Sequence, residues 1–237
     1  MKILILNGSP KGEHADTMHI TRAFVRGMNS ETAAETTVKN TVKTIHVIDS
    51  HIEYCKGCLN CMRNGGHCGI NDDMHGILDE LLSSDVVIFS FPLHCYGIPA
   101  PLAALVSRTL PLSSLAVQKE GGRWRHVGRA DVSGLRCVMI CGCGFPGSGN
   151  FFNPVCEQFK LLFPGRNTII TVPQSPMFSS DAALPVTEPR LKLVEEAGRQ
   201  FAESGKIDSA LLASVCSPMI PEEVYASIVN ADAAEQP

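Results

Sequence analysis

Four cysteines lie close together in the first third of the chain. Within 14 residues the sequence places Cys55, Cys58, Cys61 and Cys68. Four thiolates at such a spacing can surround one tetrahedral or cuboidal metal centre, and the glycines between them leave the backbone free to wrap around it. A zinc ribbon does not fit, because it separates two Cys-x2-Cys pairs by roughly 15–20 residues. An iron–sulfur cluster, another zinc site and four free thiols all remain open.

A polar loop follows the first apolar run of the chain. Residues 7–12 read NGSPKG and lead to Thr17 at the start of a helical pattern. A helix N-terminus presents free amides and the positive end of its dipole to an anion, and Ser9 and Thr17 add hydroxyl donors. One phosphate group fits this loop, which is neither a Walker loop nor a GxGxxG fingerprint. The alternative is a polar turn before a capped helix.

A second loop with chemical potential lies at residues 91–102, which read FPLHCYGIPAPL. It offers backbone amides, the aromatic face of Tyr96 and a tight turn at Gly97. Such a set suits a flat heteroaromatic ring with polar edges. The alternative for Tyr96 is an ordinary surface aromatic residue.

Short apolar runs and helical patterns alternate along the chain. The apolar runs predict strands at 3–6, 42–48, 85–91, 135–141 and 167–172. The helical patterns predict helices at 15–28, 74–82, 99–110, 150–162 and 186–204, with a short helix near 221–229. Residues 54–70 are predicted to be loop, and 113–134 a long excursion, either a hairpin or a lid.

This alternation predicts an α/β fold with a doubly wound, five-stranded parallel sheet of order 2-1-3-4-5 and helices on both faces. In that order, ligands bind beyond the carboxyl ends of the first and third strands. The loops at 7–12 and 91–102 follow those two strands. We divide the chain into a domain over residues 1–204 and a C-terminal extension over 205–237.

The composition excludes several classes of protein. With 20 basic and 24 acidic residues the net charge is −4, which argues against a nucleic-acid partner. The N-terminal apolar run is too short for a secretion signal, and no stretch approaches the ~18 apolar residues of a membrane span. We therefore expect a cytoplasmic protein without a membrane partner. Clustered cysteines there indicate metal or redox chemistry more than disulfides.

The two loops carry a family resemblance. GSPKG before a helix, with FPLHCYGIPAPLAALVSRT after the third strand, resembles the NADPH-dependent FMN reductase family of flavodoxin-like folds, closest to its iron–sulfur flavoprotein branch. The resemblance covers residues 1–172 and implies FMN, with its phosphate in the first loop and its isoalloxazine ring against the second. The residues implied at the phosphate are Ser9, Lys11 and Thr17. Those implied at the ring are Pro92, Leu93, His94, Cys95, Tyr96 and Gly97.

The four-cysteine loop is similar to the compact loop of iron–sulfur flavoproteins, which binds a [4Fe–4S] cluster through its cysteines. The similarity extends to the Asp72-Asp73-Met74 sequence that follows. Many flavodoxin-like reductases resemble this loop without a bound cluster. The resemblance therefore implies Cys55, Cys58, Cys61 and Cys68 as ligands and leaves the loading of the loop open.

Two positions depart from the family pattern. Asp16 precedes Thr17 where family members have Asn or Ser. A carboxylate beside a phosphate is unfavourable, so we expect Asp16 to point away and cap the helix. His94 and Cys95 stand where family members often carry Tyr-Trp or Tyr-Phe, a change that bears on ring stacking.

Two further cysteines end the fourth strand. Cys141 and Cys143 alternate with Gly142 and Gly144, and we expect the glycines and nearby amides to line the cofactor pocket. The alternative is a second metal or redox site made by the two thiols with His94 and Cys95. The remaining cysteines are expected to be small buried hydrophobic residues. They are Cys137, Cys156 and Cys216.

These features predict an FMN-dependent oxidoreductase of the flavin or quinone reductase type that accepts electrons from NAD(P)H. If the four-cysteine loop binds a [4Fe–4S] cluster, the flavin is linked to that cluster. The alternatives are an electron-transfer iron–sulfur flavoprotein that takes electrons from a redox protein, and a flavin-free metal-binding module. The family resemblance implies a dimer or tetramer. The basic segment 119–134 either holds a nucleotide phosphate or covers the ring, or it is a solvated loop or a dimer contact.

Overall fold

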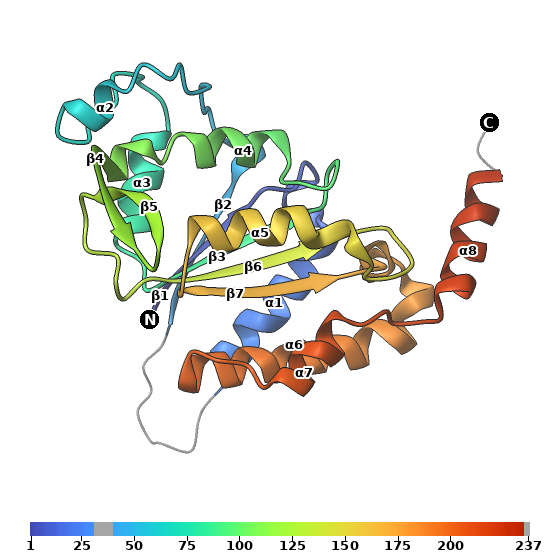
Figure 1. The fold of residues 1–237 in the computed structure, drawn as a ribbon. Helices are drawn as coiled ribbons and strands as arrows, with labels where there is room; N and C mark the ends of the chain where they lie inside the picture. The colour runs from blue at the N-terminus through green and yellow to red at the C-terminus, as the bar shows by residue number, and fades with distance from the viewer. Residues whose placement is uncertain (31–39, 235–237) are drawn as a thin grey trace.

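Five parallel strands form the central sheet. A computed structural model describes residues 1–30 and 40–234, and its strands lie side by side in the order β2–β1–β3–β6–β7 (Figure 1). Their bounds are β1 (Lys2–Asn7), β2 (Thr41–His46), β3 (Val86–Pro92), β6 (Arg136–Gly142) and β7 (Asn167–Val172). Counted along the chain, this order is 2-1-3-4-5, which confirms the predicted flavodoxin-like sheet.

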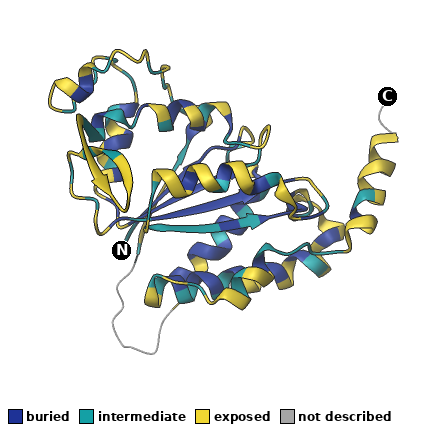
Figure 2. Cartoon of the chain, in the orientation of Figure 1, coloured by how far each residue is buried: buried dark blue, intermediate teal, exposed yellow. Residues whose placement is uncertain are grey.

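The inner strands are apolar because both of their faces are covered. Successive side chains of a strand point to opposite faces, so an unbroken apolar run such as 3–6 contributes to two cores at once. Ile3 and Ile5 belong to the core on one face, and Leu4 and Leu6 to the core on the other. Figure 2 shows the inner strands as the most deeply buried part of the chain.

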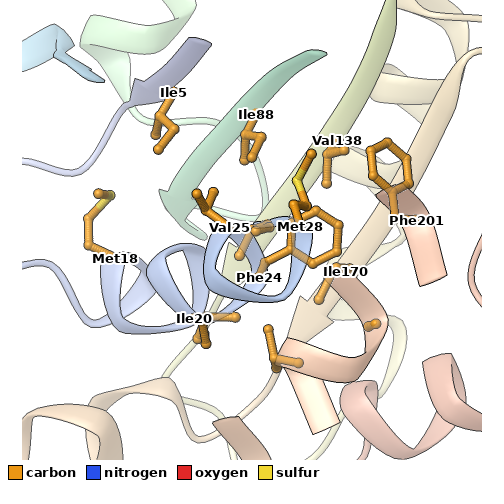
Figure 3. Close-up of a cluster of buried hydrophobic side chains, with 14 of the residues drawn as sticks. Ile5, Met18, Ile20, Phe24, Val25, Met28, Ile88, Val138, Ile170 and Phe201 are labelled. Atoms are coloured by element: carbon orange, nitrogen blue, oxygen red, sulfur yellow. The ribbon is translucent and has the colours of Figure 1, made fainter. Parts of the chain in front are cut away.

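Helices cover both faces of this sheet. On one face lie α1 (Asp16–Met28) and α6 (Leu184–Ser204), and on the other lie α3 (Met74–Leu82), α4 (Ala100–Ser107) and α5 (Asn153–Leu162). Figure 3 shows Phe24 and Met28 of α1 among side chains of the sheet and of α6. The rings of Phe24 and Phe201 lie 5.5 Å apart. The predicted helices on both faces are thus confirmed, with small shifts at their ends.

Helices α1 and α6 approach each other through two glycines. A Cβ atom at Gly27 would lie 1.8 Å from the carbonyl oxygen of Glu195, and one at Gly198 would lie 2.0 Å from that of Phe24. Real Cβ atoms do not come so close to a backbone oxygen. Only glycine therefore permits this helix crossing.

We expect Gly198→Ala to lower the free energy of unfolding by about 3 kcal/mol, because the two helices must separate to admit the methyl group. Gly76→Ala is the matched control, since Gly76 lies within α3 and a Cβ there would meet nothing within 4 Å. That change should raise stability by about 0.5–1 kcal/mol through the loss of unfolded-state freedom. Urea denaturation measures both, and equal effects would contradict the assigned role of the helix crossing.

Some elements differ from the sequence-based expectations. The predicted loop 54–70 contains a helical turn, α2 (Asn60–Arg63), and the C-terminal extension contains an unpredicted helix, α7 (Ser209–Cys216). Asp208 caps α7 by accepting hydrogen bonds from the amides of Ala210 and Leu211. An Asp directly before a largely apolar segment, here SALLASVC, is a helix start signal. The excursion is a two-stranded antiparallel hairpin, β4 (Ser113–Glu120) with β5 (Arg123–Gly128), as one of the two predicted forms.

Two buried polar side chains fasten the C-terminal extension to the domain. Arg190 of α6 donates hydrogen bonds to the carbonyl oxygens of Val215, Ser217 and Pro218. Gln174 donates to the carbonyls of Pro146 and Ile220 and accepts from the amides of Met219 and Ile220. The extension is therefore fixed to the body up to residue 220.

The last helix, α8 (Glu222–Ala234), leaves the body of the molecule (Figure 1). Its Tyr225 is buried, whereas Val224, Ile228 and Val229 are exposed. Residues 235–237 of the predicted extension lie outside the described residues. None of the helices in residues 1–30 and 40–234 combines the length and the apolar character that crossing a bilayer requires.

Candidate functional site

The two predicted cofactor loops lie side by side at the carboxyl edge of the sheet. The loop after β1 and the loop after β3 leave neighbouring parallel strands, and the amide of Gly8 donates to the carbonyl of Ser90 at 2.8 Å. The strand order reverses between β1 and β3, which is where ligands bind in open α/β sheets. The sheet thus brings together the two segments that the sequence singled out.

The first loop is held by its own buried polar groups. Asn7, fully buried, donates to the carbonyl of Gly12 at 2.6 Å and its Oδ1 accepts from the amide of Ser9 at 3.0 Å. Ser9 Oγ accepts in turn from the amide of Lys11 at 3.2 Å. Gly12 has a φ of +53°, a left-handed conformation that favours glycine. The loop is therefore fixed in shape before any ligand arrives.

Thr17 carries a buried polar atom with no partner. It is the second residue of α1 and is 1% exposed, and within the described residues its Oγ1 has no hydrogen-bond partner. A buried hydroxyl without a partner costs roughly 1–3 kcal/mol. It lies at a helix N-terminus, where free amides and the helix dipole attract an anion. Thr17 and its surroundings therefore fit a phosphate oxygen as the missing partner.

Asp16 does not cap α1, which corrects our expectation. The cap position is occupied by Ala15, and Asp16 is the first helical residue. Its carboxylate forms an ion pair with Lys11 Nζ at 3.2 Å and accepts a hydrogen bond from the hydroxyl of Ser179. These two side chains engage the carboxylate in place of the helix amides. Lys11 is mostly exposed, and this ion pair places it on the flank of the loop.

The second loop contains a strained turn. His94 and Gly97 exchange two backbone hydrogen bonds, of 3.0 and 2.8 Å. The two residues between them have positive φ angles, +46° at Cys95 and +64° at Tyr96. Such a turn normally takes Gly, Asn or Asp, and each non-glycine residue in it costs about 1–3 kcal/mol. Both side chains are thereby held outward at the carboxyl edge of the sheet, where Tyr96 is 53% exposed.

Three aromatic rings line up beside this turn. Tyr96 and Phe145 are parallel within 6° at a centroid distance of 6.3 Å, and Phe145 stacks on Phe151 at 4.4 Å. The sequence reasoning considered Tyr96 alone. Phe145 and Phe151 occur in the glycine-rich segment after β6, and an aromatic residue in such a loop beside the switch point is the signal that could have revealed them.

The two glycines after β6 have different surroundings. A Cβ at Gly142 would lie 2.6 Å from Ser175 Oγ and 2.9 Å from Thr17 Cγ2. Gly142 therefore allows the start of α1 to approach β6. Its carbonyl accepts from the amide of Leu93 at 2.7 Å, which ties the second loop to this strand. A Cβ at Gly144 would only touch Pro176 at 3.6 Å.

The thiols at the end of β6 are buried and protonated. Cys141 is fully buried and Cys143 is 5% exposed, and burial raises the pKa of both thiols. Cys95 is exposed instead. Across residues 1–30 and 40–234, no group of three or more His, Cys, Asp or Glu side chains is placed to hold a metal ion. The alternative of a second metal site at this edge has no support.

We expect alkylation to separate these cysteines. Because the thiolate is the reactive form, iodoacetamide at pH 8 should label the exposed Cys58 and Cys95 of metal- and flavin-free protein within minutes. Cys141 and Cys143 should react only after unfolding in urea, which is the control for intrinsic reactivity. Peptide mass spectrometry reads out each site. Labelling of Cys143 as fast as Cys95 would contradict the buried assignment.

The four-cysteine loop lies on the outer side of α4, where α2 packs against β4 and the turn at 110–112. Cys61 is buried and Cys58 is exposed. Burial raises the pKa of the Cys61 thiol, and the charge of Cys68 and then of Cys55 and Cys58 raises it further. Four cysteine thiols on one loop fit a thiolate-bound metal centre. Within the described residues, however, these thiols are not close enough together to act as the ligands of one metal ion.

A buried ion pair holds this loop. Asp72 and Arg108 have side chains 0% and 2% exposed, and two hydrogen bonds of 2.6 and 3.0 Å join them. Burial alone would raise the pKa of Asp72, but hydrogen bonds from Arg108 and from the amides of Glu53 and Met74 hold it below its usual value. Arg108 was not recognised from the sequence, because its partner lies 36 residues away.

Helix α4 connects the two regions. It begins directly after the second loop, and Arg108 follows its last residue. The helix has eight residues, so it is about 12 Å long. The hairpin lies at the Arg108 end of α4 (Figure 1), where Arg129 donates to the carbonyl of Met62 at 2.5 Å. The hairpin of this chain therefore flanks the four-cysteine loop and does not cover the second loop.

Comparison with known proteins agrees with this architecture. Residues 1–146 match a family described by its flavodoxin-like fold. The chain belongs to this flavodoxin-like family. It is 30% identical over 112 residues to an iron–sulfur flavoprotein of Methanocaldococcus jannaschii, a match that covers 47% of this chain and 53% of the relative. An iron–sulfur flavoprotein of Archaeoglobus fulgidus is 27% identical over 110 residues, with coverages of 46% and 49%. The chain thus spans about half of the length of these curated relatives.

Solved structures share the fold of this flavodoxin-like protein. An FMN-dependent NADH-azoreductase of Bacillus anthracis in complex with FMN superimposes with a TM-score of 0.58 at 16% identity, covering 85% of this chain and 99% of that one. An NAD(P)H:quinone oxidoreductase of Methanothermobacter marburgensis gives a TM-score of 0.58 at 15% identity, with coverages of 85% and 96%. At such identities the likeness establishes the fold.

Proposed function

We propose that the chain is an FMN-dependent oxidoreductase that accepts electrons from NAD(P)H and carries a [4Fe–4S] cluster on its four-cysteine loop. The phosphate of FMN would bind the loop after β1 through Ser9, Lys11 and Thr17. The ring would lie against Pro92, Leu93, His94, Cys95, Tyr96 and Gly97, with Gly142 and Gly144 beside it.

The single observation that carries the flavin site is the unpartnered hydroxyl of Thr17 at the N-terminus of α1. An acceptor placed there removes the cost of burying that group, and the helix dipole favours an anion at the same point. The solved azoreductase, which shares the fold, is described as a complex with FMN. With the phosphate at this point, the strained turn of Cys95 and Tyr96 would lie beside the ring.

Bound FMN would supply hydride acceptance from NAD(P)H, and the protein would supply binding, orientation and electrostatics. Each group of residues has a part. Ser9 and Thr17 would hold the phosphate, and the amides of Cys95 and Tyr96 would face the polar edge of the ring, because those of His94 and Gly97 are bonded within the turn. The parallel faces of Tyr96 and Phe145 offer a flat apolar surface for a second ring. The buried thiols Cys141 and Cys143 act as packing residues.

The cluster ligands in this proposal are Cys55, Cys58, Cys61 and Cys68. The support is the set of four thiol donors on one loop and the description of the curated relatives as iron–sulfur flavoproteins. Bound iron and sulfide would supply one-electron transfer.

Purification without oxygen, followed by a visible spectrum with flavin, iron and sulfide analysis, tests both cofactors at once. The proposal predicts flavin bands, FMN released on denaturation, and about four iron atoms per chain that are lost in Cys58→Ala. A colourless protein that cannot be loaded with FMN would instead favour a metal-binding module. Absence of iron after reconstitution would remove the cluster.

A second candidate function is an electron carrier that takes electrons from a redox protein. The description of the curated relatives as iron–sulfur flavoproteins, without a named substrate, favours it. Steady-state oxidation of NADH and NADPH separates the two. The reductase turns over with an added quinone or flavin, whereas the carrier shows negligible turnover and fast reduction by a ferredoxin-like donor.

We also propose that the chain forms a homo-oligomer, a dimer or tetramer, in the cytoplasm. The exposed apolar residues of α8, which leaves the body, support association. All ten cysteines are free, in keeping with a reducing compartment. Native mass measurement tests the oligomeric state, and a monomer at micromolar concentration would contradict it.

A further inference from the structure

Arg108 uses its hydrogen-bond donors on one loop. A guanidinium has five N–H groups. Arg108 Nη1 donates to Glu53 O at 2.7 Å and to Asp72 Oδ2 at 2.6 Å. Nη2 donates to Asp72 Oδ1 at 3.0 Å and to Cys68 Sγ at 3.6 Å. The fifth donor, Nε, is buried and has no partner within residues 1–30 and 40–234.

These contacts close the loop at both ends. Glu53 lies before the first cysteine, and Cys68 and Asp72 lie at and after the last one. Asp72 strengthens the closure because its Oδ2 accepts from the amide of Glu53 at 2.9 Å. One side chain at the end of α4 thus fixes the entry, the exit and the last sulfur of the four-cysteine loop.

A buried ion pair is not needed for stability alone, since apolar residues of similar volume often serve as well. The contact to Cys68 is what distinguishes Arg108. Arg129 reaches the same loop through its contact with the Met62 carbonyl, and within residues 1–30 and 40–234 it donates no hydrogen bond to a sulfur. A donor and a positive charge beside a ligand sulfur favour the more negative, reduced state of an iron–sulfur cluster.

We propose that Arg108 is the positioning residue for Cys68 and that its hydrogen bond to the Cys68 sulfur raises the reduction potential of the cluster. This inference rests on the proposed cluster.

The test compares Arg108→Lys with Arg129→Lys in full-length protein reconstituted with iron and sulfide. Both variants keep their charge, and only the first alters a contact to sulfur. Iron per chain and the midpoint potential of the cluster, from a redox titration followed by electron paramagnetic resonance, are the readouts. The expected result for Arg108→Lys is about a tenfold shift of the reduction equilibrium towards the oxidised cluster, ~59 mV for one electron. Arg129→Lys should match the wild type.

A second variant guards against a folding failure. In Arg108→Gln with Asp72→Asn, two amides replace the ion pair and leave no unpaired buried charge. Its potential should fall at least as far as that of Arg108→Lys. Loss of iron in either Arg108 variant with FMN and circular dichroism intact also supports positioning, provided that Arg129→Lys loads fully.

The outcomes separate the two proposals. Wild-type protein without iron after reconstitution overturns the cluster and this inference together. If the wild type binds iron and both Arg108 variants keep the same iron content and reduction potential, the role of Arg108 alone is overturned. A loss of iron or potential in Arg129→Lys as large as that in the Arg108 variants overturns it as well.

Discussion

Asp72→Ala is expected to lower the free energy of unfolding by about 3–5 kcal/mol. The change leaves the guanidinium of Arg108 buried without its carboxylate, and it removes the acceptor of the Glu53 and Met74 amides. Total stabilities of natural domains are about 5–15 kcal/mol, so the loss is a large part of the whole. Urea denaturation of metal-free protein measures it.

The adjacent residue offers a control. Asp73 is exposed and accepts one backbone hydrogen bond, from His51 at 2.7 Å. Asp73→Ala should therefore cost only about 1 kcal/mol. The stabilisation by Asp72 is present above its ordinary pKa of 3.8 and is lost as the pH falls through its lower folded value. Asp72→Ala should accordingly flatten the acid limb of stability against pH. Similar losses in the two variants would contradict the ion-pair argument.

Thr17→Val is expected to weaken FMN binding about 10- to 150-fold, the equivalent of about 1.5–3 kcal/mol for a hydrogen bond to a charged group. The same change should leave the stability of the flavin-free protein unchanged or slightly raised. The reason is that the hydroxyl has no partner to lose and valine has the same shape. Calorimetric titration with FMN and urea denaturation of the flavin-free protein give the two numbers.

Thr21 lies one turn further along α1 and is the matched control. Its hydroxyl is satisfied, because it donates to the carbonyl of Thr17 at 2.9 Å and contacts Ser90 Oγ at 2.8 Å. Thr21→Val should lower the stability of the flavin-free protein by about 1 kcal/mol and leave FMN affinity as it was. If Thr17→Val destabilises the free protein as Thr21→Val does, Thr17 is a structural residue and the phosphate assignment is wrong.

The sheet could be predicted from the sequence because its signals are local. Runs such as 3–6 and 86–89 are apolar at every position, as expected of a strand that is covered on both faces. The strand order then placed the loops after β1 and β3 together. Placing the two loops together required only the strand order, and no knowledge of contacts between distant side chains.

What the sequence did not reveal depends on distant partners. Arg108 stands at the end of a helical pattern, and nothing nearby indicates that its carboxylate partner is Asp72. Phe145 and Phe151 can be recognised as part of the candidate site only once the fold shows that they stack in line with Tyr96. Asp16 was expected to cap α1, and one of its real partners, Ser179, lies 163 residues away, whereas the other, Lys11, lies in the preceding loop.

The length of α4 restricts how this chain can vary. One end of the helix continues the second loop, and the other end places Arg108 against Asp72. Inserting one residue would turn the far end by about 100° and advance it by about 1.5 Å, which would aim the guanidinium away from the carboxylate. The tip of the β4–β5 hairpin at Gly121 and Gly122 is exposed and bears no such constraint. Insertions and deletions should therefore be accepted at the hairpin tip and rejected within α4.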